Sequence, residues 1–478
     1  MRRWGWFGAV PNRTVHRSAL MRVVVPAVVI GLLVGVCTGL LLLRDDGEQP
    51  KPLDRNTILV AVVAGLLAAA LSLLALRRQR DSERGRFAEL FGAAAIQLGH
   101  SDVAVRIAGV YAMAGVADGA GTPGQRQQCV DVLCGYLRLP YVPDEGASHL
   151  VSKTQRIEDA GTAVERVYGY RQNDRQVRDT ILRVIAGHLR PGAERSWSSC
   201  DFDFSDVIFE DLDFRDVTFA GNATRFTNAV FVGGRGTHFD RARFLGPRVT
   251  FRGAVFRAAA TRFDGAIFAH SQPVRGERDT AGTTFTDVTF AAPVSFDGAQ
   301  FGGVRTAFTR ATFAGDRSSF ADATFAADLT TFEHVLFDGG RVTFATARFS
   351  SARITFADIR CYAEATAFDC AHLGSRGRWR VGGTRETTFA RAEYHGRVSF
   401  ADAVFDGRAA IFTGGDFFGE ISFRRAAFDA REVVFEKPKA WVGVRFDWDE
   451  NPTTKPANIR PEAWPPVPAE STPELTKG

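Results

Sequence analysis

The chain has 478 residues, of which 45% are hydrophobic and 24% charged, and it carries a net charge of +5. This is enough for two or three domains, and six cysteines without paired short spacings exclude a disulfide scaffold or a zinc ribbon. Residues 200–436 hold 28 Arg and 30 acidic residues, a net charge of −2, so the remainder carries +7. Only six of the 59 basic residues are lysine, and this preference for arginine suggests a GC-rich bacterial genome.

The N-terminal quarter of the sequence predicts a membrane anchor. Residues 1–22 are basic, and two uncharged apolar runs follow at 23–43 and 57–76. At 1.5 Å per residue each run extends about 30 Å, so we expect a two-span transmembrane helical hairpin over 23–76. The first run is too long for a cleaved signal peptide. Arginines outside both runs predict that both termini are cytoplasmic, in a multi-pass protein of the inner (plasma) membrane whose first partner is the lipid bilayer.

Small residues recur at intervals of four within the first run, at Gly31, Gly35 and Gly39. Such spacing allows two helix backbones to approach closely. Packing of the two spans against each other and self-association through these glycines both remain open. Neither run contains a charged residue or a histidine, so no transport path is indicated.

Residues 77–192 predict a small α-helical adaptor, because their apolar residues recur at intervals of three and four. The spacing predicts five helices, near 87–98, 103–117, 129–136, 157–167 and 177–188, with Asp102 as an N-cap of the second. We expect His188 to be a packing residue rather than a ligand. Cys129 and Cys134 would point about 140° apart on one helix, so we do not expect them to share a metal.

Phenylalanine dominates the rest of the chain, because 36 of the 40 lie between Phe202 and Phe435. Most fall in pairs five residues apart, and a small or β-branched residue stands two positions before each ring, as in Thr261–Phe263 and Ala266–Phe268. A five-residue period drifts around a helix and changes face on a strand. We therefore expect a chain that turns every five residues, with these two positions pointing inward and successive turns stacked about 4.8 Å apart.

The segments DFSDVIF at 203–209, FDGAIF at 263–268 and FADATF at 320–325 resemble pentapeptide-repeat proteins, of the Phe-rich type found in actinobacterial membrane-anchored members. The resemblance covers about half the chain. It implies a right-handed quadrilateral β-helix, in which the repeats of 200–436 make about nine coils and a rod about 44 Å long. Pairs are separated by six to eight residues instead of five, so alternate corners should bulge. The predicted fold class is thus α plus β-solenoid.

Two segments interrupt the rhythm, at 269–282 and 374–386. We interpret both as loops inserted at a corner of a coil, which are either tolerated surface insertions or binding loops. Cys361, Leu373 and Tyr394 take the place of phenylalanine in the register, and Cys370 is predicted to be an unreactive thiol. After the repeat, residues 437–478 contain eight prolines. Trp441, Phe446 and Trp448 could cover the last coil, and disorder is expected beyond Pro452.

The predicted function is that of a non-catalytic, membrane-anchored scaffold, a rigid cytoplasmic rod that binds an unknown cytoplasmic protein. We predict no enzyme activity, no cofactor and no catalytic, cofactor-binding or metal-binding residues, since no nucleophile motif or phosphate loop is present. The resemblance raises one alternative, a DNA mimic that regulates a topoisomerase, but the repeat lacks the acidic excess this needs. For the same reason no nucleic acid is expected as a partner.

A second alternative is a β-helical enzyme that uses an acidic wall. The dense acidic group that could serve it, as a cation site or a carboxylate pair, comprises Asp201, Asp203, Asp206, Glu210, Asp211, Asp213 and Asp216. These residues occupy outward positions of the first coil, where solvated charge is the simpler expectation.

Overall fold

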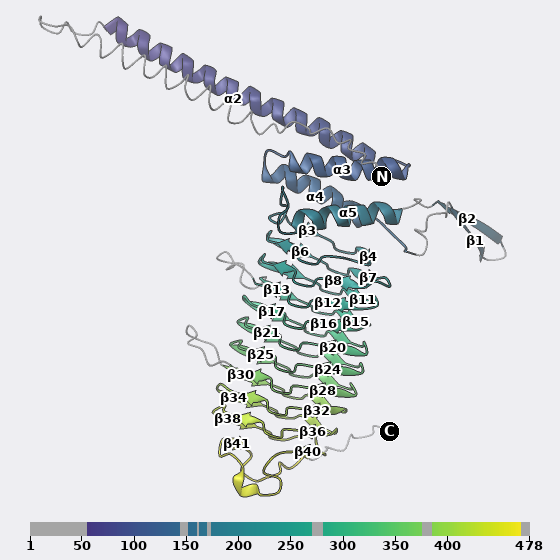
Figure 1. The fold of residues 1–478 in the computed structure, drawn as a ribbon, viewed down its shortest axis with the longest axis vertical. Coiled ribbons are helices and arrows are strands. Elements are labelled where there is room, and N and C mark those ends of the chain that lie inside the picture. The colour runs from purple at the N-terminus through teal and green to yellow at the C-terminus, as the bar shows by residue number, and fades with distance from the viewer. Residues whose placement is uncertain are drawn as a thin grey trace, which may run out of the picture. The chain divides into compact units, whose positions relative to one another are not determined.

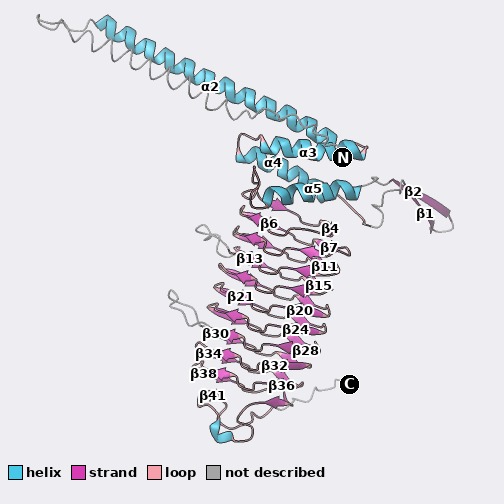
Figure 2. Ribbon diagram, viewed as in Figure 1, coloured by secondary structure: helices cyan, strands magenta, loops and turns pink. Residues whose placement is uncertain are grey.

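The computed structural model describes residues 55–143, 152–159, 162–169, 174–269, 281–374 and 385–469. The chain forms two compact units, residues 1–90 and 91–478, which we describe separately. Helices and strands are distinguished by colour in Figure 2.

The first unit contains most of one long helix, α2 (Arg55–Leu98), whose last residues belong to the second unit. The predicted second span, 57–76, lies in its N-terminal half. The helix does not end at residue 76 but continues for a further 22 residues, through the charged stretch at 77–89. The predicted first span and the loop after it lie outside the described residues.

This helix corrects the membrane prediction. None of the helices in the described ranges combines the length and the apolar character that a bilayer crossing requires. The predicted two-span hairpin, the transmembrane assignment and the inner-membrane localisation are contradicted by this finding. The glycines proposed for self-association, Gly31, Gly35 and Gly39, are not among the described residues.

The second unit begins with packed helices, as the apolar spacing predicts. They are α3 (Val103–Asp118), α4 (Pro123–Leu137) and α5 (Asp174–Leu189). Asp102 is confirmed as the N-cap of α3, since its side chain accepts a hydrogen bond from the N–H of Ala104 at 2.7 Å. Thr122 caps α4 in the same way through the N–H of Gln125.

The predicted helix at 157–167 is wrong, because the chain forms an antiparallel pair of strands there. These are β1 (Ser152–Asp159) and β2 (Thr162–Gly169), in which Ile157 is paired with Val164. Only residues 160 and 161 separate the strands, and one of them is a glycine. The β-branched residues that suggested a helical stripe are equally suited to a hairpin, and a glycine between them favours the turn.

From Phe202 onward the chain builds a β-solenoid of about ten coils, whose strands stack coil upon coil into four parallel sheets (Figure 1). We call these sheets walls one to four, in the order in which the chain visits them. Wall one consists of β3 (Phe202–Asp203), β6 (Ala223–Arg225), β10 (Arg248–Thr250), β14 (Gly282–Thr284), β18 (Arg305–Ala307), β22 (Leu329–Thr331), β26 (Arg353–Thr355), β30 (Glu386–Thr388), β34 (Ala409–Ile411), β38 (Glu432–Val434) and β41 (Ile459–Arg460). Wall two consists of β4 (Ile208–Glu210), β7 (Val230–Val232), β11 (Val255–Phe256), β15 (Thr289–Phe290), β19 (Thr312–Phe313), β23 (Leu336–Phe337), β27 (Arg360–Cys361), β31 (Glu393–Tyr394), β35 (Asp416–Phe417) and β39 (Ala440–Trp441).

The other two walls have nine strands each. Wall three consists of β8 (Thr237–His238), β12 (Thr261–Arg262), β16 (Val294–Ser295), β20 (Arg317–Ser319), β24 (Arg341–Thr343), β28 (Ala365–Ala367), β32 (Arg397–Ser399), β36 (Ile421–Ser422) and β40 (Val444–Arg445). Wall four consists of β5 (Thr218–Phe219), β9 (Arg243–Phe244), β13 (Ile267–Phe268), β17 (Gln300–Phe301), β21 (Thr324–Phe325), β25 (Arg348–Phe349), β29 (His372–Leu373), β33 (Val404–Phe405) and β37 (Ala427–Phe428).

The interior is filled by four columns of aromatic rings, one for each wall. Within a column, rings of successive coils stack, as Phe226 and Phe251 do with centroids 4.7 Å apart and planes within 6°. Between columns the rings meet edge to face, as Phe251 and Phe263 do at 88°. The small residue two positions earlier is buried with its ring, for example Ala254 before Phe256. The two predicted inward positions are therefore confirmed.

Tight turns form the corners after walls one and three. At one such corner the carbonyl of Phe251 accepts a hydrogen bond from the N–H of Ala254, and Gly253 between them has φ +68°. A left-handed third residue is the mark of a type II turn, which favours glycine and asparagine. Asn228 fills the equivalent position at φ +54°.

The ladders extend past residue 436, the predicted end of the repeat. Strands β39 to β41 continue three of the walls, and Ile459 of β41 is fully buried. Phe446 stacks on Phe423 at 4.7 Å, and Trp464 contacts Phe446 edge-on at 5.1 Å. This differs from the disorder predicted beyond Pro452. The extra strands bring the solenoid to about ten coils instead of nine.

One side chain from this C-terminal segment covers the open edge of wall four. The amide of Asn458 donates to the carbonyls of Phe428 and Ala430, at 2.9 and 2.6 Å. We expect Asn458→Ala to lower the free energy of unfolding by about 1–2 kcal/mol, since two hydrogen bonds are lost. An uncovered strand edge also favours association. Urea unfolding and light scattering measure both effects, and an Asn458→Ala protein as stable and monodisperse as wild type would contradict the prediction.

Candidate functional site

The seven carboxylates of the predicted acidic group do not converge on one point. Each has at least one polar partner in the first coils or in the helical segment. The contacts of the carboxylates are Asp201 with the N–H of Ala223, Asp203 with Arg138 and Ser205, Asp206 with Asn228, Glu210 with Tyr141 and Arg175, Asp211 with Arg175 and Arg235, Asp213 with Arg190 and Arg215, and Asp216 with Arg241. Within the described ranges, no group of three His, Cys, Asp or Glu side chains is placed to hold a metal ion.

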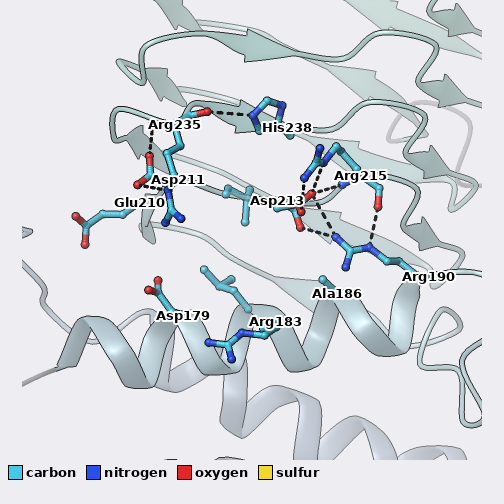
Figure 3. A pocket seen from close by; sticks show the side chains of 12 residues that line it. Asp179, Arg183, Ala186, Arg190, Glu210, Asp211, Asp213, Arg215, Arg235 and His238 are labelled. Carbon is cyan, nitrogen blue, oxygen red and sulfur yellow. Dashed lines mark hydrogen bonds and ion pairs between the residues drawn. The ribbon is translucent and has the colours of Figure 1, made fainter. Parts of the chain in front are cut away.

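Three of these residues, Glu210, Asp211 and Asp213, line the one cleft that we single out, between α5 and the start of the solenoid (Figure 3). Its volume is about 440 Å³. The lining residues are Asp179, Leu182, Arg183 and Ala186 from α5, Arg190 directly after it, and Glu210, Asp211, Leu212, Asp213, Arg215, Arg235 and His238 from the first two coils. Four carboxylates and four arginines are among the lining residues, so the cleft has no single sign of charge.

At one end of the cleft, Asp213 is held by two arginines. Arg215 donates two hydrogen bonds of 2.9 Å to it, and Arg190, directly after α5, lies 3.3 Å from it. The hydrogen bonds from Arg215, the largest influence, lower the pKa of Asp213 to about 2. This carboxylate is therefore ionised at neutral pH and serves as an anchor for α5.

The other end of the cleft contains a second set of ion pairs. Arg175 lies 3.2 Å from Glu210, which also accepts a short hydrogen bond from the hydroxyl of Tyr141. Arg235 lies 3.2 Å from Asp211. Burial raises the pKa of Asp179, against the opposing effect of Arg175. The ion pairs in the cleft hold the helical segment to the first coil, and we assign the cleft no reaction.

Backbone edges of the first coil are covered by groups from the helical segment. The amide of Gln127 on α4 both donates to the carbonyl and accepts from the N–H of Asp201, each at 2.8 Å, as a neighbouring strand would. Arg190 donates to the carbonyls of Asp213 and Arg215. The helices thus act as an N-terminal cap for the solenoid, which protects exposed edges from pairing with other chains. No sequence pattern marks Gln127 for this role.

A buried charged cluster joins the three helices. The carboxylate of Asp174 in α5 accepts hydrogen bonds from Arg106 of α3 at 2.8 Å, from Arg178 at 2.8 Å and from the hydroxyl of Tyr136 of α4 at 2.6 Å. Arg106, Asp174 and Arg178 are only 1%, 7% and 4% exposed. Arg178 also donates to the carbonyl of Leu137 at 2.7 Å. The helical spacing that predicted these helices gave no indication of this cluster.

His188 lies at the junction between α5 and the solenoid. Its ring stacks on the fully buried Trp197 at 4.0 Å, and its two nitrogens contact the carbonyl of Val184 at 2.7 Å and the carboxylate of Asp118 at 3.2 Å. Burial by itself would lower the pKa of His188, but the contacts with Asp118 and Val184 raise it above its ordinary value. This agrees with the predicted packing role.

The raised pKa of His188 gives a testable pH dependence. Because the folded pKa exceeds the unfolded one, the stabilisation is complete below the ordinary pKa of 6.5 and is lost as pH rises through the folded pKa. We expect the free energy of urea unfolding of the helical cap, followed by helical circular dichroism, to fall as the pH rises above 6.5. His188→Gln should flatten this dependence, and an unchanged slope in that variant would show that another group is responsible.

The remaining predicted features occupy the following places. Cys361, Leu373 and Tyr394 all lie inward in the register of phenylalanine, and burial raises the pKa of Cys361 to about 12. Cys370 is exposed at a tight corner. The two interrupting loops fall mostly outside the described residues. Their flanking strands place both at the corner between walls four and one, after β13 and after β29.

Comparison with known proteins returns no match among protein-family descriptions, curated proteins or solved structures. The class of protein is therefore assigned from the fold. About ten regularly spaced parallel coils in four sheets define a β-solenoid, the architecture of a repeat protein.

Proposed function

We propose that the chain is a pentapeptide-repeat protein that acts without catalysis, as a rigid scaffold whose walls bind another protein. Its five-residue segments, two inward positions and left-handed corners support the family. The resemblance of 263–268 and 320–325 to that repeat supports it further.

The sealed interior is the observation that carries this proposal. Rings such as Phe285, Phe308 and Phe332 are 0% exposed and stack directly on one another at 4.8 Å. Because these side chains fill the inside of the rod, recognition must occur on its outer surface. Each coil holds its outward side chains at a fixed level, which suits a surface that positions a partner.

Ion pairs between coils add to this rigidity. They join left-handed corner residues of consecutive coils, with two hydrogen bonds in each pair, and are Asp216–Arg241, Asp287–Arg310, Asp358–Arg391 and Asp402–Arg425. Because arginines neutralise these carboxylates, the surface lacks the continuous acidic field of a DNA mimic. The near-neutral charge of 200–436 points the same way.

Proximity labelling tests the scaffold function. A labelling enzyme fused after residue 478 should mark a small, reproducible set of proteins in the native host. A second fusion that lacks residues 200–469 should lose that set. Identical labelling by both fusions, or turnover of a compound by the purified chain in a metabolite panel, would contradict the proposal.

A further inference from the structure

The outer surface of the solenoid carries one line of exposed hydrophobic side chains. Among the described residues from 200 to 460, the large hydrophobic side chains that remain exposed are Tyr362, Phe418 and Val442, at 46%, 62% and 54%. Each stands one residue after the end of a wall-two strand, and His395 fills the same position in the coil between Tyr362 and Phe418. We call these four residues the aromatic ladder.

The three rings of the aromatic ladder follow one another from coil to coil. The ring of His395 stacks on that of Tyr362 with centroids 4.7 Å apart, and it lies 6.2 Å from the ring of Phe418. In earlier coils this position is taken by small or charged residues, such as Ala314 and Asp338, or by the half-buried Val232. A contiguous apolar patch on an otherwise polar surface is typical of an interaction site.

Two acidic residues lie close to Phe418 in the chain. Asp416 and Glu420 stand two residues before and after Phe418, and no ion pair joins either to another described residue. One carboxylate oxygen of Asp416 is buried and accepts no hydrogen bond in the described part of the chain. In the preceding coil, Glu393 already accepts a hydrogen bond from the hydroxyl of Tyr362 at 3.2 Å. A cation over the Phe418 ring would meet the negative face of the aromatic ring, and Asp416 and Glu420 supply negative charge on either side of Phe418 in the chain.

We propose that the aromatic ladder binds a protein segment with apolar side chains followed by an arginine or lysine, whose cation lies over Phe418 between Asp416 and Glu420. This rests on the proposed scaffold function and gives it a docking site. A second copy of the chain is a poorer occupant, because a twofold axis along the ladder would bring Asp416 of one copy against Glu420 of the other. That contact would be repulsive.

Fluorescence anisotropy on the full chain tests this docking site with a labelled peptide of alternating leucine and arginine. We expect Phe418→Glu and the double variant Asp416→Asn with Glu420→Gln each to weaken binding by about tenfold or more. A peptide of alternating leucine and glutamate should bind wild type at least about tenfold more weakly than the basic one. Ala314→Glu, at the same register position two coils before Tyr362, is the matched control and should bind like wild type.

Equal peptide affinity of Phe418→Glu and Ala314→Glu, at equal melting temperatures, would overturn the docking site. So would a wild-type dimer in light scattering that Phe418→Glu splits, since the occupant would then be a second copy. The scaffold function is judged separately. If Phe418→Glu leaves the proximity-labelled set intact while deletion of 200–469 abolishes it, the ladder is wrong and the scaffold function stands.

Discussion

Phe417→Ala is expected to lower the free energy of unfolding by about 3–5 kcal/mol, whereas Phe418→Ala changes it by less than about 0.5 kcal/mol. The two rings are adjacent in sequence, but Phe417 is 0% exposed in the column of wall two and Phe418 lies outside. Phe417 stacks on Tyr394 at 5.3 Å and packs against Trp441 at 5.0 Å. Alanine at 417 would leave a cavity that neighbouring coils cannot close, because their backbones are fixed by ladder hydrogen bonds.

Urea unfolding of the two variants, followed by circular dichroism in the strand region, makes this comparison. Each protein is the control for the other, since both lose the same ring from the same strand end. Equal losses of stability, or a larger loss for Phe418→Ala, would contradict the assignment of Phe417 to the interior and Phe418 to the surface.

Asp174→Ala is expected to destabilise the helical cap by about 3–5 kcal/mol. The substitution would leave Arg106 and Arg178 buried without their shared carboxylate. An unpaired buried charge lowers the stability far more than replacement of all three charged side chains by apolar ones. Replacing all three by apolar residues, as in Arg106→Met with Asp174→Leu and Arg178→Met, should recover most of the loss. Thermal unfolding followed by helical circular dichroism provides the measurement.

The control for Asp174→Ala is Glu89→Ala, which removes an exposed carboxylate from α2 and should change stability by less than about 0.5 kcal/mol. Loss of the cap would also uncover the edge of the first coil, which Gln127 and Arg190 now cover. We therefore expect Asp174→Ala to form larger species in light scattering at temperatures where Glu89→Ala remains monodisperse. A stability change of Asp174→Ala equal to that of the control would contradict the role given to this cluster.

The interior of the solenoid was predictable because one physical constraint repeats in every coil. A ring and a small residue two positions earlier must both point inward, so the sequence from 202 to 435 carries the signal many times. The last coil escaped prediction because tryptophans and irregular spacing replace the phenylalanine rhythm there, as at Trp441. Yet Trp441 pairs in register with Phe417.

Features that depend on single contacts were not predictable. The carboxylate of Asp174 and the amide of Gln127 act through residues 38 and 74 positions away in the chain, and nothing local distinguishes them. The helix predicted at 157–167 failed because Ile157 and Val164 fit a helical stripe and a strand pair equally well. The membrane prediction took the apolar run at 57–76 as a separate span flanked by arginines, whereas in the structure that run is part of the longer helix α2, which continues through the charged stretch after it.

The fold and the scaffold function both depend on phenylalanine rings that are sealed inside the coils, and hydroxyl-radical footprinting of the intact chain measures this directly. Between residues 202 and 435, we predict strong oxidation of Phe418 and Tyr362 and protection of the column rings, such as Phe251, Phe308 and Phe389. Comparable oxidation of the column rings in the folded protein would contradict the account.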